Sequence, residues 1–475
     1  MGNNINKEDR NLMLLFFLLL FCSSLPPIES HWDPYVSPKW YAAGLMLFII
    51  LMCIRNKTHV IDIKSLSSCW DKASLFFVIW ILFATLFEYI VCQEGDKVIQ
   101  WPYDNPSGLS LVLCLTIIPA LNALHSNRLR VLLFIIVLIM VLLTKSRTGL
   151  IVMSVFIIGT IFSFIKKRMF GILVMITLIG FVLIYVYVNK EDSSKGRYFI
   201  AKTTMELIME KPLIGHGPNG FERKYMERQG QYFMTHPNSE YAILADEISH
   251  PLSEFLLAWI DYGLLGLAVL IMLLLFPLIC FLRMKKRKEV LECLSVIVFC
   301  VFSYPFNYPI TWIVIIVLYT NLFCNSQKQH KFILCFILVF SVKVSIMAFE
   351  DIGIINSSNI LYNKASRMYR RGKFHDAYII SKECSEYLSS YNLELLSGDI
   401  CFRLGLYPEG LKHYKTASNM CPSRFAPLEG MLNVYTETDD SIMIKETTSK
   451  IVKKPIKIHN QDVYRIIINA QKILN

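Results

Sequence analysis

Apolar stretches long enough to cross a lipid bilayer recur along this chain, and they restrict the folds open to it. Of its 475 residues, 54% are hydrophobic, a share typical of membrane proteins rather than soluble domains. Runs of roughly 14–20 apolar residues span a hydrocarbon core of about 30 Å as helices when the flanking residues reach the interface. We therefore predict an all-α, polytopic membrane protein of about 11 transmembrane helices. The candidate spans are residues 12–25, 41–54, 73–91, 108–124, 131–143, 150–165, 170–188, 252–275, 291–302, 311–323 and 332–349.

Lys and Arg concentrate in every second loop between these spans. They are Lys7 and Arg10, Arg55 and Lys57, Arg128 and Arg130, residues 166–168, residues 283–288, and Lys328 and Lys331. Because short loops rich in Lys and Arg stay in the cytoplasm, this alternation predicts a cytoplasmic N-terminus. It also puts the large loop 189–251 and the C-terminal region on the periplasmic side of a bacterial inner membrane. The first span is then a retained signal anchor rather than a cleaved signal peptide.

Charge and cysteine usage narrow the classes of partner and cofactor. Most of the net charge of +11 is accounted for by the loop pattern, so nucleic acid is not an expected partner. The 13 cysteines lie mostly within apolar spans, where Cys behaves as a small hydrophobic residue. Since the sequence has no metal-ligand spacing such as C-x-x-C, we expect no metal and no cofactor.

After residue 349 the composition becomes that of a soluble helical domain, which predicts a membrane domain at 1–349 and a helical domain at 350–475. Two segments of the latter align at a period of 33: Gly372, Phe374, Ala377 and Cys384 recur as Gly405, Tyr407, Gly410 and Ala417. Small residues at such positions let paired helices approach, and the Gly-x-aromatic element makes the turn. The pattern resembles the tetratricopeptide repeat, whose period is about 34, with a third, degraded unit from Ala426. An ordinary helical hairpin domain is the alternative, and either is a docking module without catalytic groups.

The loop 189–251 is the long polar interruption of the apolar pattern, and it is where we expect the chemistry. Arg197 precedes a predicted helix over residues 198–210, near whose N-terminus backbone N–H groups and the helix dipole attract anions. The apolar residues of that helix favour a position on the membrane surface; they are Phe199, Ile200, Met205, Ile208 and Met209. The glycine-rich stretch 212–221 permits unusual backbone conformations and close ligand approach. His216 and Arg223 are further candidates for binding substrate.

A second cationic element, Ser146-Arg147, lies in a predicted external turn between two spans. Short external loops usually lack Lys and Arg, so cations in this turn indicate a role other than setting the orientation of the spans. One interpretation is that the Arg147 guanidinium binds a phosphate or pyrophosphate, with Ser146 beside it as a binding residue. The alternative is a side chain that reaches the lipid headgroups.

His250 stands where the chain enters the next apolar span. If Pro251 occupies the first helical turn, His250 lies near the N-cap and Glu254 shares its face. A histidine titrating near neutral pH suits a general base that deprotonates a sugar or Ser/Thr hydroxyl. The alternative is a histidine satisfied by its neighbours at the membrane interface. His216 and His236 are rival bases that lack an adjacent helix entry, and no G-x-S-x-G elbow supports a nucleophilic serine.

In their order along the chain, these motifs resemble the O-antigen ligase family of bacterial membrane glycosyltransferases. The superfamily also includes O-antigen polymerases and protein O-oligosaccharyltransferases. Ser146-Arg147 matches the Ser-Arg element of the family. Arg197 matches its loop arginine, and residues 212–221 match its P-L-x-G-x-G-x-x-x-F motif. The closing motif of the family is matched by His250, Glu254, Gly263 and Gly266. Pro251 stands where the family has Asn, so an amide that would orient the histidine is absent. The resemblance covers roughly residues 108–323.

The resemblance implies a metal-independent, inverting transfer from an undecaprenyl-diphosphate-linked glycan. Arg147 and Arg197 would bind the pyrophosphate, Arg223, His216, Ser146 and Glu254 would assist binding, and His250 would deprotonate the acceptor hydroxyl. The acceptor would be lipid A-core, as in a ligase, a growing glycan, as in a polymerase, or Ser/Thr of a protein. The repeats favour a protein acceptor or a protein partner. Membrane lipid completes the expected partners.

Two other classes remain open from the sequence. One is a glycan transporter with a regulatory tail, which the few charged residues within the spans (Glu88, Glu292 and Lys343) argue against. The other is a non-catalytic scaffold of the cell envelope. Loss of transfer on substitution of His250 separates both from a transferase.

Overall fold

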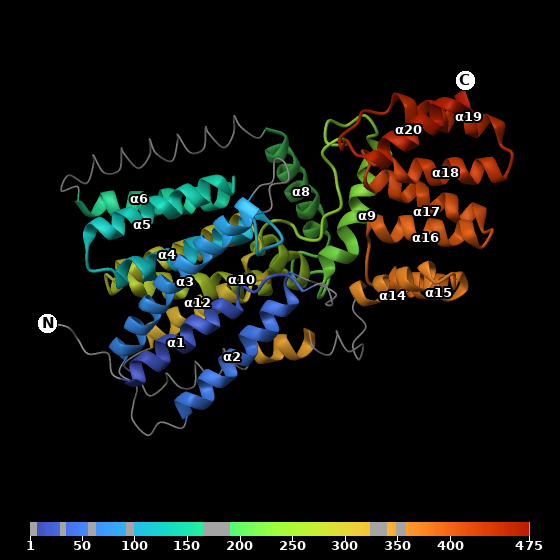
Figure 1. Ribbon diagram of the computed structural model, residues 1–475. Coiled ribbons are helices and arrows are strands. Elements are labelled where there is room, and N and C mark those ends of the chain that lie inside the picture. The colour runs from blue at the N-terminus through green and yellow to red at the C-terminus, as the bar shows by residue number, and fades with distance from the viewer. Residues whose placement is uncertain are drawn as a thin grey trace. The chain divides into compact units, whose positions relative to one another are not determined.

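The structure is a computed structural model that describes residues 7–28, 35–55, 63–91, 99–164, 191–323, 340–347 and 358–474. Helices make up 78% of it, and the described residues form no strand, which confirms the all-α class. The chain divides into two compact units (Figure 1). The first unit combines Met1–Asn189 with Val269–Ile352, and the second combines Lys190–Ala268 with Gly353–Asn475.

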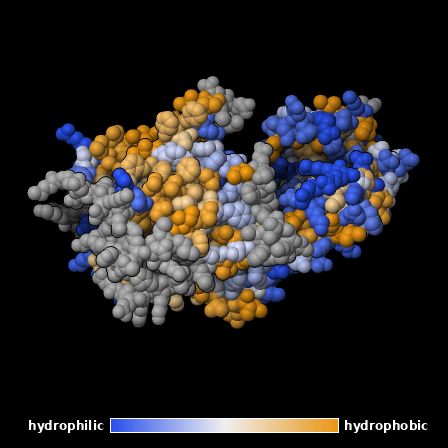
Figure 2. Space-filling view, turned by 60° about the horizontal axis from the view of Figure 1, so that its bottom comes forward, coloured by the Kyte–Doolittle hydropathy of each residue, from blue (hydrophilic) through white to orange (hydrophobic). Residues whose placement is uncertain are grey.

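The first unit contains the apolar helices. They are α1 (Lys7–Cys22), α2 (Ser37–Arg55), α3 (Ile63–Val91), α4 (Pro106–Ala123), α5 (Asn127–Leu143), α6 (Arg147–Phe164), the later part of α10 (Glu254–Arg283), α11 (Arg287–Phe302), the short η1 (Pro305–Asn307) and α12 (Pro309–Leu322). Hydrophobic residues gather over this unit on the face drawn in Figure 2.

Among the described residues, three helical stretches are long and apolar enough to cross a membrane: Ser67–Val91, Pro106–Ala123 and Glu254–Arg283. Shorter apolar helices cover Arg10–Cys22, Arg147–Gly159 and Pro309–Leu322. The predicted span 170–188 and most of 332–349 lie outside the described residues. A membrane protein is therefore supported, while the number of about 11 spans stays a prediction.

Polar contacts within the first unit join loops that the charge pattern assigns to one side. Buried Lys39 donates to the Pro102 carbonyl at 3.0 Å, and the Trp40 indole donates to the Asn307 carbonyl at 2.8 Å. The charge pattern predicts all three segments to be periplasmic. Two loops predicted to be cytoplasmic meet in the ion pair of Lys288 with Asp71. The contacts thus agree with the predicted alternation, and which side faces the cytoplasm stays a prediction.

The second unit contains the loop helices α8 (Glu191–Glu210) and α9 (Gly220–Thr235), residues 254–268 of α10, and the residues 358–474, here called the tail. The tail helices are α14 (Ser358–Arg370), α15 (Phe374–Cys384), α16 (Tyr391–Arg403), α17 (Tyr407–Met420), α18 (Ala426–Glu437), α19 (Ser441–Lys453) and α20 (Gln461–Leu474). On the face drawn in Figure 2, hydrophilic residues are prominent over the second unit.

The period of 33 recurs in the tail as two helix pairs with the same turn. Gly372 and Gly405 both have φ of 73°, and α15 and α17 each begin two residues after the glycine. At the end of a helix, glycine adopts this left-handed conformation without strain, whereas other residues rarely do. The side chains predicted to lie at close helix contacts, Ala377, Cys384 and Ala417, are fully buried. Successive helix pairs are therefore repeated, and their assignment to the tetratricopeptide family stays a prediction.

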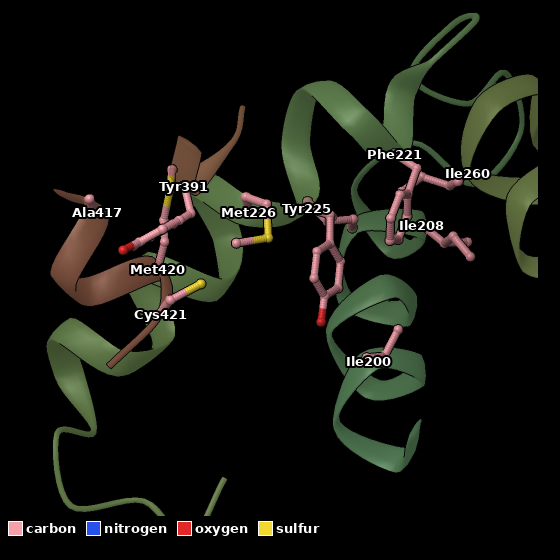
Figure 3. Close-up of a cluster of buried hydrophobic side chains, with 11 residues drawn as sticks. Ile200, Ile208, Phe221, Tyr225, Met226, Ile260, Tyr391, Ala417, Met420 and Cys421 are labelled. Carbon is pink, nitrogen blue, oxygen red and sulfur yellow. The ribbon is translucent and has the colours of Figure 1, made fainter. Parts of the chain in front are cut away.

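The loop and the tail share one hydrophobic core (Figure 3). Phe221, Ile208 and Ile260 lie at one end of the core, and Tyr225 connects them to a second group. That group consists of Met226, Tyr391, Ala417, Met420 and Cys421. Full burial of a large apolar side chain contributes about 1.5–3 kcal/mol, so the loop and the tail stabilise each other.

This core corrects the expected placement of the helix that follows Arg197. Phe199, Ile200 and Ile208 were expected on a membrane surface, but they are 2%, 7% and 0% exposed. They pack against α9 and other segments of the second unit. Only Met205 and Met209 of the predicted apolar face are exposed. An apolar helix face has the same sequence pattern whether protein or lipid covers it, which explains the wrong prediction.

Candidate functional site

The residues 211–219, here called the glycine turn, are held against the N-terminal part of α10 by backbone hydrogen bonds. The amides of His216 and Gly217 donate to the carbonyls of Ile260 and Asp261 at 2.7 and 2.9 Å. In the reverse direction, the Leu264 amide donates to the Pro212 carbonyl at 3.0 Å. The glycine turn and α10 therefore form one rigid substructure.

Two glycines make this approach possible. Gly215 has φ of +70°, and a Cβ there would lie 2.5 Å from the Asp261 carbonyl oxygen. Gly263 interrupts α10 with φ of 66° and ψ of −161°, and its Cβ would lie 2.2 Å from the Leu213 carbonyl oxygen. No side chain fits at either position. The unusual backbone predicted for the glycine-rich stretch is confirmed, and the neighbour that it admits is α10.

Asp261 connects the same part of α10 to the start of α9. Its Oδ1 accepts from the Phe221 amide at 3.1 Å. It thereby satisfies a backbone donor that a helix N-terminus leaves open. Asp261 is absent from the site residues predicted from the sequence. The available signal was an acidic residue inside an otherwise apolar span.

The structure brings together two predicted binding residues, His216 and Arg223. The Arg223 guanidinium donates to the His216 carbonyl at 2.7 Å and to the Pro218 carbonyl at 3.1 Å. The His216 Nε2 lies 2.8 Å from the Leu207 carbonyl, so this nitrogen carries a proton that it donates. Both side chains thus hold the glycine turn in shape, which makes Nε2 of His216 a poor acceptor for a substrate proton.

His216 and Arg223 also line a cavity of about 560 Å³ between the loop and the tail. The loop contributes Lys211, His216, Arg223, Lys224 and Glu227, and the tail contributes Ser385, Glu386, Leu388, Ser389, Glu394, Thr416 and Met420. A cavity of this size accommodates a small ligand. Cations lie mainly on the loop side, and carboxylates and hydroxyls lie on the tail side, so the lining is polar on both.

Arg197 lies in the second turn of α8 and not at its start. The helix already includes Glu191, because Asp192, the two serines that follow it and Gly196 continue the helical backbone. The predicted position at a helix N-terminus is therefore wrong, and the anion affinity expected from the helix dipole falls off beyond the first turn. Arg197 is half-buried.

His250 precedes α10 by a short irregular segment. The helix begins at Glu254, and Leu252 has φ of +57°, so Pro251 does not occupy the first turn. The expected place of His250 near the N-cap is wrong, because the left-handed residue breaks the helical path before Ser253. His250 is half-buried, and Glu254 is 6% exposed as the first residue of α10.

Ser146 and Arg147 belong to the first unit, whereas Arg197 and His250 belong to the second. The Ser146 hydroxyl accepts from the Ser110 hydroxyl at 2.7 Å and from the Gly149 amide at 3.3 Å, which makes it the N-cap of α6. Arg147 is the first residue of that helix and is half-buried. The convergence of Arg147, Arg197 and His250 on one ligand stays a prediction.

The segment just before His250 is bound to the tail by charged groups. The Arg424 guanidinium donates to both carboxylate oxygens of Asp246 at 2.7 and 2.9 Å, and Lys457 lies 3.5 Å from the same carboxylate. Burial alone would raise the pKa of Asp246, but the bonds from Arg424, the Glu247 amide and the charge of Lys457 outweigh it and hold that pKa below its usual value. We call Asp246, Arg424 and Lys457 the charged clamp.

Further bonds flank the charged clamp on both sides. Glu247 accepts from the side chains of Ser390 and Asn392. Fully buried Gln229 of α9 donates to the Met420 carbonyl at 2.7 Å and to the Asp246 carbonyl at 3.0 Å. The tail therefore fixes the backbone of the loop within a few residues of His250.

Three potential metal ligands of the tail, on Cys401, Glu409 and His413, lie within 4.8 Å of one another. His413 Nδ1 is 2.7 Å from Glu394, and Glu409 accepts from the Tyr378 hydroxyl at 2.9 Å. These bonds join α15, α16 and α17, so the packing of the helices accounts for the grouping.

Comparison with known proteins identifies the segment that carries this site. Residues 132–271 match the family model described as O-antigen ligase. The match includes Arg147, Arg197, the glycine turn and His250, and it confirms the resemblance drawn from the motifs. No curated protein matches the chain.

Proposed function

We propose that this chain, whose residues 132–271 belong to the O-antigen ligase family, transfers a glycan from undecaprenyl diphosphate to an acceptor hydroxyl on the periplasmic face of the inner membrane. The observation that carries the proposal is the family match across both candidate arginines and His250. That match supports membership of a superfamily of membrane glycosyltransferases. The donor, the residue roles and the side of the membrane are what we propose beyond it.

The chemistry needs few protein groups, because a lipid diphosphate is already a good leaving group. His250 takes the proton of the acceptor hydroxyl while its oxygen attacks the anomeric carbon. The bond from that carbon to the diphosphate oxygen breaks, and the lipid diphosphate leaves with the electron pair, which inverts the anomeric centre. Arg147 and Arg197 neutralise the charge that develops on the diphosphate. The position of Arg147 at the first residue of α6 supports this role, since helix N-termini attract anions.

The tail has a positioning role in this proposal. A base must lie within hydrogen-bond reach of the proton that it removes, and small displacements cost much of the rate. The charged clamp fixes Asp246, four residues before His250. The charged clamp therefore supports the geometry of the proposed base without touching substrate itself.

The cavity between the loop and the tail suits part of a glycan, since its carboxylates, hydroxyls and cations match a ligand rich in hydroxyl groups. We expect the double variant Glu386→Gln with Ser389→Ala to raise the KM for the glycan several-fold with kcat unchanged. A fall in kcat at constant KM would instead assign these residues to the geometry of the base.

The central test is the variant His250→Ala in the full-length protein, with glycan transfer measured in reconstituted membranes. We expect a loss of at least about 100-fold, the usual contribution of a general base. The matched control is His236→Ala, which removes an exposed histidine at the end of the neighbouring helix α9. Equal activity of both variants at normal protein levels would contradict the proposal.

The acceptor distinguishes a ligase from a polymerase and from a protein O-oligosaccharyltransferase. A deletion strain analysed by mass spectrometry of surface glycolipids and exported proteins identifies which acceptor loses its glycan. We expect lipid A-core to lose it. A change confined to exported proteins would assign the chain to protein glycosylation by the same chemistry.

A further inference from the structure

The glycine turn carries two large apolar side chains that face away from the protein. Leu213 and Ile214 are 68% and 78% exposed. Beside them, α10 exposes Tyr262, Leu264 and Leu265 at 54%, 50% and 74%. We call these five residues the apolar patch. Water-soluble surfaces rarely expose a contiguous group of large apolar residues, so the apolar patch marks an interaction surface.

The two parts of the apolar patch are locked together. The Leu264 amide donates to the carbonyls of Pro212 and Leu213 at 3.0 and 3.2 Å, and the Trp259 indole donates to the Pro212 carbonyl at 3.0 Å. Gly263 of α10 lies against the Leu213 carbonyl of the turn, where no side chain would fit. The apolar patch is therefore a preformed surface, and binding to it orders few additional groups.

The position of the apolar patch on α10 indicates which partner covers it. Its helical half lies within Glu254–Arg283, the most apolar of the candidate membrane spans. Further along the same helix, Val269 and Met272 are 60% and 69% exposed, so the exposed apolar residues that begin at Leu264, after the interruption at Gly263, continue along α10. A lipid bilayer covers such a helix.

Groups at the edge of the apolar patch fit the boundary between hydrocarbon and headgroups. Lys211, whose side chain also lines one edge of the cavity, is exposed two residues before Leu213, and Tyr262 is one of the five patch residues. Lys reaches phosphate headgroups from an apolar stem, and Tyr is enriched at this depth.

We propose that the apolar patch is seated in the lipid bilayer at the level of the outer-leaflet headgroups and upper acyl chains. The glycine turn then acts as a wedge that fixes how deep the loop lies. His216 of the same turn and Arg223 of α9 line the polar cavity. A donor whose diphosphate lies at the headgroups is thereby presented to the loop at a fixed height. The seating in lipid holds whatever reaction the chain performs, and only the presentation of the donor rests on the proposed function.

Photo-cross-linking tests the proposal directly. Benzoylphenylalanine is incorporated at position 214 of the full-length protein in nanodiscs of phosphatidylethanolamine and phosphatidylglycerol, and adducts are identified by mass spectrometry. The matched control is position 442, an isoleucine of α19 that is 80% exposed. We expect lipid adducts at position 214 to exceed those at position 442 by at least 10-fold.

Two results would overturn the proposal: equal lipid adducts at both positions, or adducts at position 214 that join two protein chains. Position 265 provides a second probe on the helical half of the apolar patch, for which the same excess is expected. Because this readout needs no glycan donor, its failure is distinguishable from a failure of the transferase assignment.

Discussion

The loop 189–251 presents two regions that are held in opposite ways. Around Asp246, it meets the tail through charged and directional bonds with Arg424 and Lys457. Around Leu213 and Ile214, hydrogen bonds to the backbone carbonyls of the glycine turn fix its shape, and the two side chains make an exposed apolar surface. Directional bonds recognise one partner in one geometry, whereas an apolar surface suits a fluid one. The difference indicates that the first region binds protein and the second faces lipid.

The largest effect is expected at Gly263, where α10 packs against the backbone of the glycine turn. Replacement of Gly263 by Ala sets a Cβ 2.2 Å from the Leu213 carbonyl oxygen in a conformation that only glycine adopts readily. We expect the free energy of unfolding to fall by about 3 kcal/mol or more, through strain and separation of the turn from α10. Thermal unfolding of the purified protein measures it.

The matched control for that variant is Gly196→Ala. Gly196 lies within α8, where an added Cβ would meet nothing within 4 Å, and Ala favours a helix over Gly by about 1 kcal/mol. The control should be unchanged or slightly more stable. A Gly263→Ala protein as stable as this control would show that the turn and α10 are not tightly coupled.

The next effect concerns the protein-binding region alone. Arg424→Gln removes the bidentate bond to Asp246 and leaves a partly buried carboxylate, at a cost of about 1–3 kcal/mol. Because the charged clamp lies beside the His250 segment, we expect glycan transfer to fall by about 10-fold or more, mainly in kcat. Steady-state kinetics of the reconstituted protein check this.

An exposed arginine of the tail supplies the comparison. Arg465 bonds Glu429 at 3.1 Å with its own side chain 55% exposed, and such surface pairs contribute about 0–1 kcal/mol. Arg465→Gln should leave transfer unchanged. If both arginine variants lose the same activity, the effect comes from the tail in general and not from the charged clamp.

A smaller effect, visible in its pH dependence, is expected at Lys454. This side chain donates to the Arg424 carbonyl at 2.6 Å, and burial lowers its pKa from 10.5 to about 8. Between these two values the unfolded chain binds a proton that the folded protein does not, so stability rises with pH across this window. Below pH 8 the charged form in the fold opposes folding.

Lys454→Met tests this sign. The variant should lack the rise in unfolding free energy between about pH 8 and pH 10.5, which chemical denaturation at several pH values measures. An identical slope in the parent protein and the variant would exclude Lys454 as its source.

Features that depend on backbone restrictions are those that the sequence predicts well. Glycines at 215, 263, 372 and 405 stand out in the sequence, and all four have a positive φ in the structure, which few other residues adopt readily. The repeat of 33 residues is visible for the same reason. The family resemblance follows from short motifs that combine glycines with Arg147, Arg197 and His250, and the family match confirms it.

Prediction from the sequence fails where the role of a residue depends on which distant segment, or which lipid, covers it. Ile200 and Ile208 of α8 have the spacing of a lipid-facing helix but are buried in the protein core. Asp246 and Arg424 lie far apart in the chain, so no local pattern pairs them. The helix boundaries near Arg197 and His250 differ from those predicted because Gly196 is tolerated in α8 and Leu252 is left-handed.

The smallest effect on stability, and the sharpest contrast with the charged clamp, is expected at the apolar patch. Leu213→Ser combined with Ile214→Ser changes side chains that make few contacts within the protein, so the unfolding free energy in detergent should shift by less than about 0.5 kcal/mol. In nanodiscs, lipid adducts from benzoylphenylalanine at position 265 should fall several-fold, because the turn no longer favours the bilayer. If the double variant unfolds far more easily in detergent, these residues pack against protein, and the assignment of this region to lipid is wrong.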